Sequence, residues 1–292
     1  MKREVIVVNP DVFNKIKKNI SEGGRDNLHV LSDFDRTITY GLSGEKRTPT
    51  VISQLRSDPK YLGAEYKKQT EKWFEEYHPI EVDSSISLEE KKAKMHEWWM
   101  KYFEFLVKCG FNRDLIKRVV KEMPLKFRKG SLEFLSYLNK NNIPLIFMSA
   151  APGDMLIEYI EQNGLMFPNV YVISNRYKFN SKGKAVRIKE PIIHTFNKTE
   201  ITLEDYPIFN KIKNRKNVLL IGDSYGDVGM IEGFDYKNLL KVGFYNDSSE
   251  GILKDFTSHF DVVLTGDQDF GYVNKLLKEI LNDNPLKLKR KT

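Results

Sequence analysis

Four apolar runs define the hydrophobic pattern of the chain, and each of them ends in small or acidic residues. These runs are "LHVLSDFD" near residue 28, "IPLIFMSAA" near residue 143, "NVLLIGDS" near residue 217 and "FDVVLTGD" near residue 260. Continuous Val, Ile and Leu runs are typical of strands in a parallel sheet that helices cover on both faces. Helical periodicity follows in "GDMLIEYIEQNG" after the second run and in "GYVNKLLKEIL" after the last. The pattern predicts an α/β fold with a doubly wound parallel-sheet core, in which ligands bind beyond the carboxyl ends of the strands.

A polar segment rich in Lys, Glu and aromatic residues interrupts this alternation between residues 45 and 125. It contains no convincing buried strand. Within "KMHEWWMKYFEFLVK", apolar side chains recur at three- and four-residue steps, as in an amphipathic helix. They are Met95, Trp98, Trp99, Tyr102, Phe103, Leu106 and Val107. We therefore expect residues 45–125 to form an inserted α-helical cap domain on an α/β core made of residues 1–44 and 126–292, and the final "PLKLKRKT" to be a solvated basic end.

The composition is that of a globular protein in a reducing compartment. Hydrophobic residues make up 40% and charged residues 30%, which fits neither a disordered chain nor a membrane protein. The net charge of +7 favours anionic partners, such as phosphorylated metabolites or nucleic acid. A single cysteine, Cys109, excludes an internal disulfide. Since the apolar run in "MKREVIVVNP" is too short for a signal sequence or a membrane span, we expect a cytoplasmic protein.

Complementary polar side chains close three of the apolar runs. Asp33 and Asp35 close the first, Ser149 closes the second, and Asp223 with Asp227 close the third. Clustered carboxylates form a hard oxygen site that suits Mg²⁺, which keeps waters and a substrate phosphate as its other ligands. A carboxylate can also attack a phosphoryl group when a cation masks the repulsion between them. The pattern therefore indicates phosphoryl chemistry at the carboxyl edge of the sheet.

Each of these residues also has an ordinary structural explanation. Asp-x-Asp is common in turns, and Ser149 could cap the following helix. Lys198, in "HTFNKTE" before the third run, would hold a phosphate and stabilise developing charge, but it is one of many lysines. An EF-hand is excluded because the sixth and twelfth positions, counted from Asp33, are Ile38 and Gly44. The ordered occurrence of all these residues at the ends of separate strands favours catalysis over structure.

Four ordered motifs give the chain a specific resemblance. "DFDRT", "FMSA", the lysine of "FNKTE" and "GDSYGD" resemble the motifs of the haloacid dehalogenase-like phosphohydrolases. Over nearly the whole chain, "KRTPT", "HPIEVD", "EEKKAKMHEWW", "FPNVYVISN", "IIHTFNK", "LLIGDSYGD" and "HFDVVLTGDQ" resemble the type III cytosolic pyrimidine 5′-nucleotidases. The resemblance implies a two-domain, haloacid dehalogenase-like enzyme that uses Mg²⁺ to hydrolyse nucleoside 5′-monophosphates to nucleoside and phosphate.

The resemblance also implies roles for the acidic residues. Asp33 is the expected nucleophile, which forms an aspartyl-phosphate, and Asp35 is the expected general acid and then general base. The expected Mg²⁺ ligands are the side chains of Asp33 and Asp223 and the backbone carbonyl of Asp35. Asp227 resembles a neighbour that orients these groups. Thr37, in the same motif as the nucleophile, is a further candidate for such a supporting role.

Substrate ligands are expected in both parts of the chain. The expected phosphate ligands are Ser149, the backbone at Ala150, and Lys198. In the cap, Glu81 of "PIEVD" matches a substrate-binding glutamate, whose carboxylate would accept a hydrogen bond from an exocyclic amine such as that of cytosine. Trp98 and Tyr102, one helical turn apart, are candidates for stacking on the base, although aromatic residues at this spacing more often pack a core.

Three positions depart from the family pattern. Tyr102 stands where a small serine is expected, Ala151 and Pro152 replace Gly-Ile, and "TPTVI" lacks the Cys-His that follows the same Pro-Thr. The first and third departures affect candidate base contacts. We expect a pyrimidine nucleotide, CMP or UMP, as the substrate, and the alternative is 7-methylguanosine monophosphate or another small phosphomonoester.

Two features point to other classes of function. "GDSYG" fits the Gly-x-Ser-x-Gly elbow of serine hydrolases, with Ser224 as nucleophile and His259 after it. Too few residues follow Ser224 for the rest of such a fold, and Asp33, Asp35 and Lys198 would have no role. The basic charge and the aromatic cap would suit an RNA- or DNA-binding module, but no motif of that class is present. We expect a monomeric enzyme whose partner is a nucleoside monophosphate, with no membrane and no specific nucleic acid.

Overall fold

A seven-stranded sheet lies at the centre of the computed structural model, which describes residues 2–44, 46–83, 85–198, 206–247 and 250–282. The strand order is β1-β11-β10-β9-β2-β5-β6, and all neighbours are parallel except β1 and β11. These strands are β1 (Val5–Val7), β2 (Leu28–Ser32), β5 (Leu145–Pro152), β6 (Val170–Asn175), β9 (Asn217–Gly222), β10 (Asn238–Tyr245) and β11 (Val262–Thr265). Two small hairpins are formed by β3 (Leu42–Ser43) with β4 (Lys46–Arg47) and by β7 (Tyr177–Phe179) with β8 (Ala185–Ile188).

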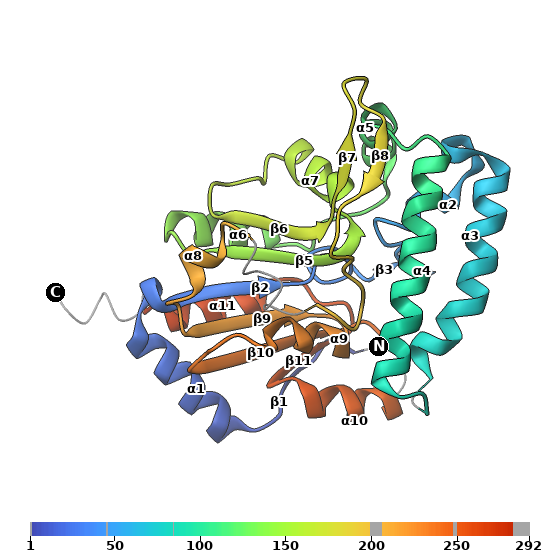
Figure 1. Ribbon diagram of the computed structural model, residues 1–292. Coiled ribbons are helices and arrows are strands. Elements are labelled where there is room, and N and C mark those ends of the chain that lie inside the picture. The colour runs from blue at the N-terminus through green and yellow to red at the C-terminus, as the bar shows by residue number, and fades with distance from the viewer. Residues whose placement is uncertain (1, 45, 84, 199–205, 248–249, 283–292) are drawn as a thin grey trace.

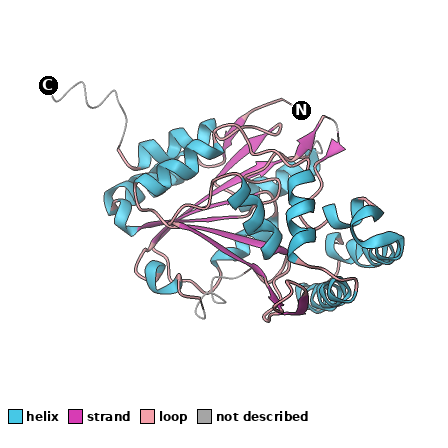
Figure 2. Ribbon diagram, turned by 90° about the horizontal axis from the view of Figure 1, so that it is seen from above, coloured by secondary structure: helices cyan, strands magenta, loops and turns pink. Residues whose placement is uncertain are grey.

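Helices fill the segments between the strands and lie on both sides of the sheet (Figure 1; Figure 2). They are α1 (Pro10–Gly23), α2 (Gln54–Ser57), α3 (Pro59–Val82), α4 (Leu88–Lys108), α5 (Arg113–Glu122), α6 (Ser131–Lys140), α7 (Gly153–Gln162), α8 (Phe209–Ile212), α9 (Tyr225–Val228), α10 (Glu250–His259) and α11 (Gly271–Ile280). Within the described ranges, no helix combines the length and the apolar character needed to cross a bilayer.

Alternating side chains of the central strands belong to two separate hydrophobic clusters. On β9, Leu219 and Ile221 pack in a cluster with residues of α1, α6, α7 and α11. Val218 and Leu220 pack in a second cluster, with residues of α8 and α10. Because successive side chains of a strand point to opposite faces, both faces of the sheet are buried. This explains why the strands read as continuous apolar runs, and it confirms the predicted doubly wound α/β core.

The register of the central strands brings their carboxyl ends to one edge. β2 lies between β9 and β5, and its last residue, Ser32, is opposite Ile221 on one side and Phe147 on the other. The backbone amide of Asp33 still donates to the carbonyl of Ile221 at 2.9 Å. Asp33 is therefore positioned by the sheet itself, next to the residues that follow β9.

Four helices, α2 to α5, occupy most of the segment predicted to form a cap. The long helices α3 and α4 pack against each other and stand beside the edge at which the central strands end (Figure 1). Helix α4 begins after Ser87, whose side chain accepts a hydrogen bond from the amide of Glu90. Five of the seven residues in the predicted stripe of α4 are buried, namely Met95, Trp98, Tyr102, Phe103 and Leu106, and the other two, Trp99 and Val107, are half-buried. The helical character of the segment is confirmed, whereas the domain boundaries near residues 45 and 125 stay a prediction.

The structure differs from the sequence prediction in the extent and number of the strands. The four apolar runs form β2, β5, β9 and β11, but β5 continues to Pro152, so Ser149 lies inside the strand and not at its end. In the central sheet, strands β1, β6 and β10 are additional, and the two small hairpins were not predicted either. β1 is a three-residue edge strand, and polar residues interrupt the apolar pattern in "VYVISN" of β6 and "NLLKVGFY" of β10. The basic end predicted for "PLKLKRKT" lies outside the described residues.

Candidate active site

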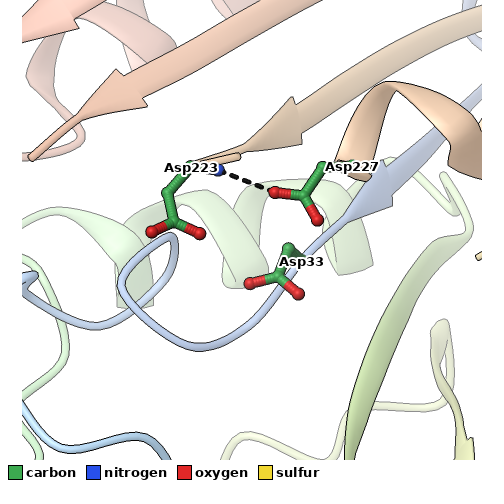
Figure 3. Close-up of side chains that lie close together, drawn as sticks. All are labelled: Asp33, Asp223 and Asp227. Carbon is green, nitrogen blue, oxygen red and sulfur yellow. Dashed lines mark hydrogen bonds between the residues drawn. The ribbon is translucent and has the colours of Figure 1, made fainter. Parts of the chain in front are cut away.

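Three carboxylates gather where β2 and β9 end. Asp33 follows β2, Asp223 follows β9, and Asp227 lies in the short helix α9. One oxygen atom of each carboxylate lies within 4.8 Å of the others. Figure 3 shows the three side chains close together, with a hydrogen bond between Asp223 and Asp227. The fold thus brings together acids that lie far apart in the sequence.

Lys198 adds a cation to this group. Its Nζ donates to Asp33 Oδ1 at 2.5 Å and to Asp227 Oδ1 at 2.9 Å, and the lysine side chain is buried. Burial disfavours the charged ammonium, but the charges of Asp227 and Asp33 outweigh that effect, so the pKa of Lys198 is raised. Lys198 is therefore charged at neutral pH and lies where it can bind an anion beside Asp33.

Asp227 uses both of its carboxylate oxygens to hold other groups. Oδ1 accepts the hydrogen bond from Lys198, and Oδ2 accepts one from each of the backbone amides of Asp223 and Ser224, both at 2.9 Å. Gly222 permits this approach, because a β-carbon at that position would lie 2.5 Å from Cβ of Asp227. These contacts favour an orienting role for Asp227 over a role as a metal ligand.

Asp33 and Asp223 form a donor set that fits a hard divalent cation. Burial raises the pKa of Asp33 well above its usual value; Lys198 opposes this shift, whereas Asp227 and Asp223 add to it. Burial, together with Asp227, raises the pKa of Asp223 to about 7. A bound cation stabilises carboxylates that otherwise resist ionisation, and donors consisting only of oxygen suit Mg²⁺. The residues present therefore fit the predicted metal.

Asp35 lies in the turn after β2 and is half-buried. Its Oδ1 accepts a hydrogen bond from the backbone amide of Val51 at 2.9 Å. Burial raises the pKa of Asp35 to about 6, against the opposing effects of the Val51 hydrogen bond and of Arg36. A carboxyl group with such a pKa gives up and takes up a proton readily near neutral pH, as a general acid and base must.

The phosphate-binding candidates of β5 lie in an irregular strand end, where the pairing with β6 shifts between Ser149 and Pro152. Ser149 Oγ accepts a hydrogen bond from the amide of Ala151 at 3.1 Å. The N-cap residue of α7 is Pro152, so Ser149 does not cap that helix. The carbonyl of Ala150 accepts a hydrogen bond from Nδ2 of Asn175 at 2.7 Å. Fixed partners therefore hold the backbone of this turn.

Glu81 reaches the core from the C-terminal end of α3. Its Oε1 accepts a hydrogen bond from Thr195 Oγ1 at 2.6 Å, and its Oε2 lies 3.2 Å from His78 Nδ1. Burial favours the neutral acid, but the hydrogen bonds of His78 and Thr195 prevail and lower the pKa of Glu81. Since Thr195 precedes Lys198 by three residues, the structure brings this predicted cap residue to the segment that carries the lysine.

The two aromatic candidates of α4 lie within the packed helical segment. Trp98 is 8% exposed and stacks on Tyr77 with 5.6 Å between ring centroids. Its Nε1 has no hydrogen-bond partner among the described residues. Tyr102 is 4% exposed, and its hydroxyl accepts a hydrogen bond from that of Tyr66 at 2.7 Å. Trp98 thus retains an unused donor, whereas Tyr102 contributes to the packing of α3 against α4; a base contact by either residue stays a prediction.

Several buried polar residues support the site through contacts between distant segments. Thr37 is buried, and its carbonyl accepts a hydrogen bond from Nε of Arg128 at 2.8 Å. Asn175 exchanges hydrogen bonds of 2.8 Å with the backbone of Ile193, which precedes the lysine segment. The sequence interpretation misses Arg128 and Asn246, because an isolated Arg or Asn has no spacing signal, and it misses Asn175 inside the quoted "FPNVYVISN" motif. It also misses Thr195, although this residue lies inside the quoted "IIHTFNK" motif.

The alternative nucleophile is not arranged as in a serine hydrolase. Ser224 is the N-cap residue of α9. Nδ1 of His259 lies 3.0 Å from Ser258 Oγ and 3.0 Å from the carbonyl of Asp255. In the part of the chain that the structure describes, no hydrogen bond joins Ser224 to His259.

Comparison with known proteins finds 5′-nucleotidases that match nearly the whole chain. The family described as "Pyrimidine 5'-nucleotidase (UMPH-1)" matches residues 37–281. The 7-methylguanosine phosphate-specific 5′-nucleotidase of Homo sapiens is 35% identical over 282 residues, which cover 96% of this chain and 94% of the relative. The crystal structure of cytosolic 5′-nucleotidase IIIB bound to cytidine matches with a TM-score of 0.84 and 29% identity, over 97% of this chain and 95% of that one.

A more distant structure shares the fold alone. It is the phospho-aspartyl intermediate analogue of phosphoserine phosphatase, with a TM-score of 0.51 and 18% identity over 85% of this chain and 97% of that one. The comparisons support neither a serine hydrolase nor a nucleic-acid-binding module. With its α/β core of the haloacid dehalogenase type and the match over residues 37–281, the chain belongs to the pyrimidine 5′-nucleotidase (UMPH-1) family and is a hydrolase of the 5′-nucleotidase class.

Proposed function

We propose that this enzyme hydrolyses nucleoside 5′-monophosphates to nucleoside and phosphate, with Mg²⁺ as cofactor and an aspartyl-phosphate on Asp33 as intermediate. One observation carries the proposal: Lys198 bridges Asp33 and Asp227 beside Asp223, at the edge where the central strands end. A nucleophilic carboxylate, a buried cation and metal-binding oxygens therefore lie together, which is what phosphoryl transfer to a carboxylate requires.

The metal would be held by the side chains of Asp33 and Asp223 and by the backbone carbonyl of Asp35. When bound, the ion would offset the repulsion between the attacking carboxylate and the phosphate group. Lys198 supplies a second positive charge on the same side of Asp33 as Asp227. Ser149 and the backbone at Ala150 complete the set of proposed phosphate ligands.

The chemistry then divides into two steps. In the first, an oxygen of Asp33 bonds to phosphorus while the bond from phosphorus to the nucleoside 5′ oxygen breaks. Asp35 gives its proton to that oxygen, so the nucleoside leaves as a neutral alcohol. In the second, water attacks phosphorus, Asp35 takes up a proton of the water, and the bond between phosphorus and Asp33 breaks. Asp35, whose pKa is raised to about 6, suits both transfers.

The nucleobase is recognised by residues of the helices α3 and α4. Glu81 is ionised, because its hydrogen bonds lower the pKa, and a carboxylate accepts a hydrogen bond from an exocyclic amine. Cytosine and 7-methylguanine carry such an amine, whereas uracil does not. The relative named as 7-methylguanosine phosphate-specific and the structure titled as bound to cytidine agree with an amine-bearing base. We therefore place CMP and 7-methylguanosine monophosphate ahead of UMP, with Trp98 as the residue that stacks on the base.

The proposal includes the architecture and the setting of the enzyme. Residues 45–125 act as a cap over the core formed by residues 1–44 and 126–292, and closure of the cap excludes water from the site. The enzyme works as a monomer in the cytoplasm. The single cysteine and the cytosolic 5′-nucleotidase among the similar structures support that location.

The test is phosphate release from a panel of nucleoside 5′-monophosphates, with and without Mg²⁺. We expect release that depends on Mg²⁺, and a loss of at least about 1,000-fold in Asp33→Asn, as is typical when a nucleophile is removed. Asp26→Asn, on the exposed 3₁₀ turn before β2, is the matched control and should keep wild-type activity. Normal turnover by Asp33→Asn, or equal release without the metal, would contradict the proposal.

A further inference from the structure

A fully buried arginine, Arg128, lies behind the turn that carries Asp35. Its side chain has no exposed surface, and each of its five N–H groups makes one hydrogen bond. Nε donates to the Thr37 carbonyl at 2.8 Å, and Nη2 donates to the Arg36 carbonyl at 2.6 Å. The remaining three bonds are from Nη1 to Asp267 Oδ1 at 2.7 Å, from Nη1 to the Gln268 carbonyl at 2.6 Å, and from Nη2 to Asn246 Oδ1 at 2.9 Å.

The turn that Arg128 binds has an unfavourable backbone conformation. Arg36 has a φ of 59°, and Asp267, on the other side of the guanidinium, has a φ of 50°. Residues with a β-carbon seldom adopt this left-handed region, so such residues persist only where their surroundings fix them. The carbonyl of Arg36 accepts hydrogen bonds from both Arg128 and Asn246, the latter at 3.0 Å. Arg128 therefore supports two left-handed residues at once.

The guanidinium also connects the turn after β2, which carries Asp35, to the ends of two other strands. Asn246 follows β10 and Asp267 follows β11. The carboxylate of Asp267 accepts hydrogen bonds from the amides of Gly41 and Leu42, at 2.8 and 3.1 Å, and so holds the far end of the same turn. The ring of Phe244 lies 4.3 Å from the guanidinium carbon and covers one face of it. The position of the turn is thus set by its contacts with Arg128 and with the strand ends.

We propose that Arg128 is a positioning residue for Asp35, the proton-transferring group. This inference rests on the proposed function. Arg128 holds the carbonyl groups of Arg36 and Thr37, which directly follow Asp35, while the Val51 amide holds the Asp35 carboxylate. Loss of the guanidinium frees the turn and moves the acid away from the oxygen that it must protonate. Lysine cannot replace arginine here, because one ammonium group cannot serve five acceptors in a planar arrangement.

Two substrates with different leaving groups distinguish this positioning role from a general contribution to the stability of the fold. A nucleoside leaves as a poorly stabilised alkoxide unless an acid protonates it, whereas p-nitrophenolate leaves without a proton. The quotient kcat/KM reports the steps up to phosphoryl transfer to Asp33, in which the leaving group departs. A displaced Asp35 therefore lowers kcat/KM for a nucleoside monophosphate and spares that for p-nitrophenyl phosphate. A merely destabilised fold lowers both values equally.

The chain offers a matched control at the other end of β2. Arg215 is half-buried, and its Nη1 likewise donates to backbone carbonyls, those of Arg25 at 3.0 Å and Leu28 at 2.8 Å. Arg215→Lys should lower the melting temperature without changing the ratio of the two kcat/KM values. Asp35→Asn calibrates the assay, since it removes the proton donor directly.

We expect Arg128→Lys to lose about 10- to 100-fold in kcat/KM for the nucleotide and no more than a few-fold for p-nitrophenyl phosphate. The loss is smaller than the roughly 100- to 10,000-fold of general acid catalysis, because the acid is displaced and not removed. If Arg128→Lys does not fold, Asn246→Ala serves in its place. It removes one of the two donors to the Arg36 carbonyl and should change the ratio in the same direction, by a smaller factor.

Equal losses on both substrates, or an unchanged ratio in a folded variant, would overturn the positioning role. That outcome is distinct from failure of the proposed function. If the wild-type enzyme releases no phosphate from any nucleoside monophosphate, the proposed function is wrong. If the wild-type enzyme does release phosphate but Arg128→Lys keeps the wild-type ratio, only the role of Arg128 is wrong.

Discussion

Thr195 Oγ1 donates a 2.6 Å hydrogen bond to Glu81 Oε1, and this bond joins the end of α3 to the segment that carries Lys198. The carbonyl of Thr195 also packs against Gly226, where a β-carbon would lie 2.6 Å from the oxygen. Thr195 therefore contacts the proposed base-reading residue and the motif that contains Asp227. A change in its hydroxyl should affect Glu81 without altering the packing.

Thr195→Val is the first prediction, because it removes the hydroxyl and keeps the shape of the side chain. A hydrogen bond to a charged group contributes about 1.5–3 kcal/mol, so we expect kcat/KM for CMP to fall about 10-fold while that for UMP changes little. Thr195→Ser retains the hydroxyl and should behave as the wild type. Equal losses for CMP and UMP would show instead that the hydroxyl acts on the lysine segment.

Replacement of Lys198 by methionine is the second prediction. The variant removes the cation shared by Asp33 and Asp227 and leaves two buried carboxylates without it. We expect kcat to fall by about 100- to 1,000-fold, the effect of removing a group that stabilises transition-state charge. The melting temperature should fall as well, since breaking a buried ion pair is destabilising. Steady-state kinetics on the folded fraction provide the measurement.

Lys211→Met is the control for that variant, because Lys211 is exposed and its Nζ donates to the hydroxyl of Tyr171, at 2.7 Å. It should leave both kcat and the melting temperature close to wild type. If Lys198→Met retains more than about a tenth of the wild-type kcat, Lys198 contributes less than about 1.4 kcal/mol to the transition state and its proposed role fails.

The sequence was sufficient to predict that the acids lie together, and the reason is geometric; Lys198 was named from its motif, and the structure places it beside them. Asp33 and Asp223 directly follow apolar runs, and parallel strands end at one edge of a sheet, so both acids were expected at that edge; the pairing of β2 with β9 then brings them together. Periodicity likewise identified α4 and its buried stripe. In each case the signal is local, because the spacing of a few neighbouring residues determines the outcome.

The rest of the site depends on contacts between distant segments. Arg128 has partners at residues 36, 37, 246, 267 and 268, and no spacing within "KFRKG" encodes them. Tyr102 shows the same limit of prediction from the sequence. Its periodicity predicts burial but not its partner, which is the hydroxyl of Tyr66 on α3. The extension of β5 past Ser149 depends on its pairing with β6, whose apolar pattern is interrupted.

Mg²⁺ binding is the third prediction, and it has a readout independent of activity. Burial and neighbouring acids raise the pKa of Asp33 and bring that of Asp223 to about 7, so a bound cation should stabilise the folded state. Ligand at 100 times its dissociation constant contributes about 2.7 kcal/mol. We expect Mg²⁺ to raise the melting temperature of the wild type, and EDTA to stop phosphate release until Mg²⁺ is restored.

Asp223→Asn is the matched test of that assignment. The amide is close in size to the carboxylate but carries no charge, so the rise in melting temperature with Mg²⁺ should be lost or strongly reduced. Asp26→Asn, far from the site, should retain the full rise. An equal rise in all three proteins would place the bound metal elsewhere on the chain.

His29 gives the fourth prediction, which concerns stability against pH. Its ring is fully buried in β2, with Nδ1 3.0 Å from the carbonyl of Arg215, and burial lowers its pKa to about 3. The unfolded chain takes up a proton near pH 6.5, whereas the folded protein does so only near pH 3. The stability that His29 contributes is therefore complete above pH 6.5 and is lost progressively as the pH falls; at pH 5 the loss is about 2 kcal/mol.

His29→Asn removes this titration and leaves an amide that can donate to the same carbonyl. Urea unfolding at pH 7.5, 6, 5 and 4.5 measures the effect as the difference between the two stability curves. We expect this difference to shrink as the pH falls, because only the wild type loses stability through His29, and the contributions of the active-site acids cancel. His259→Asn, at a half-exposed position, should follow the wild-type curve. If the His29→Asn curve runs parallel to that of the wild type from pH 6.5 to 5, then burial of a neutral His29 does not contribute to acid sensitivity.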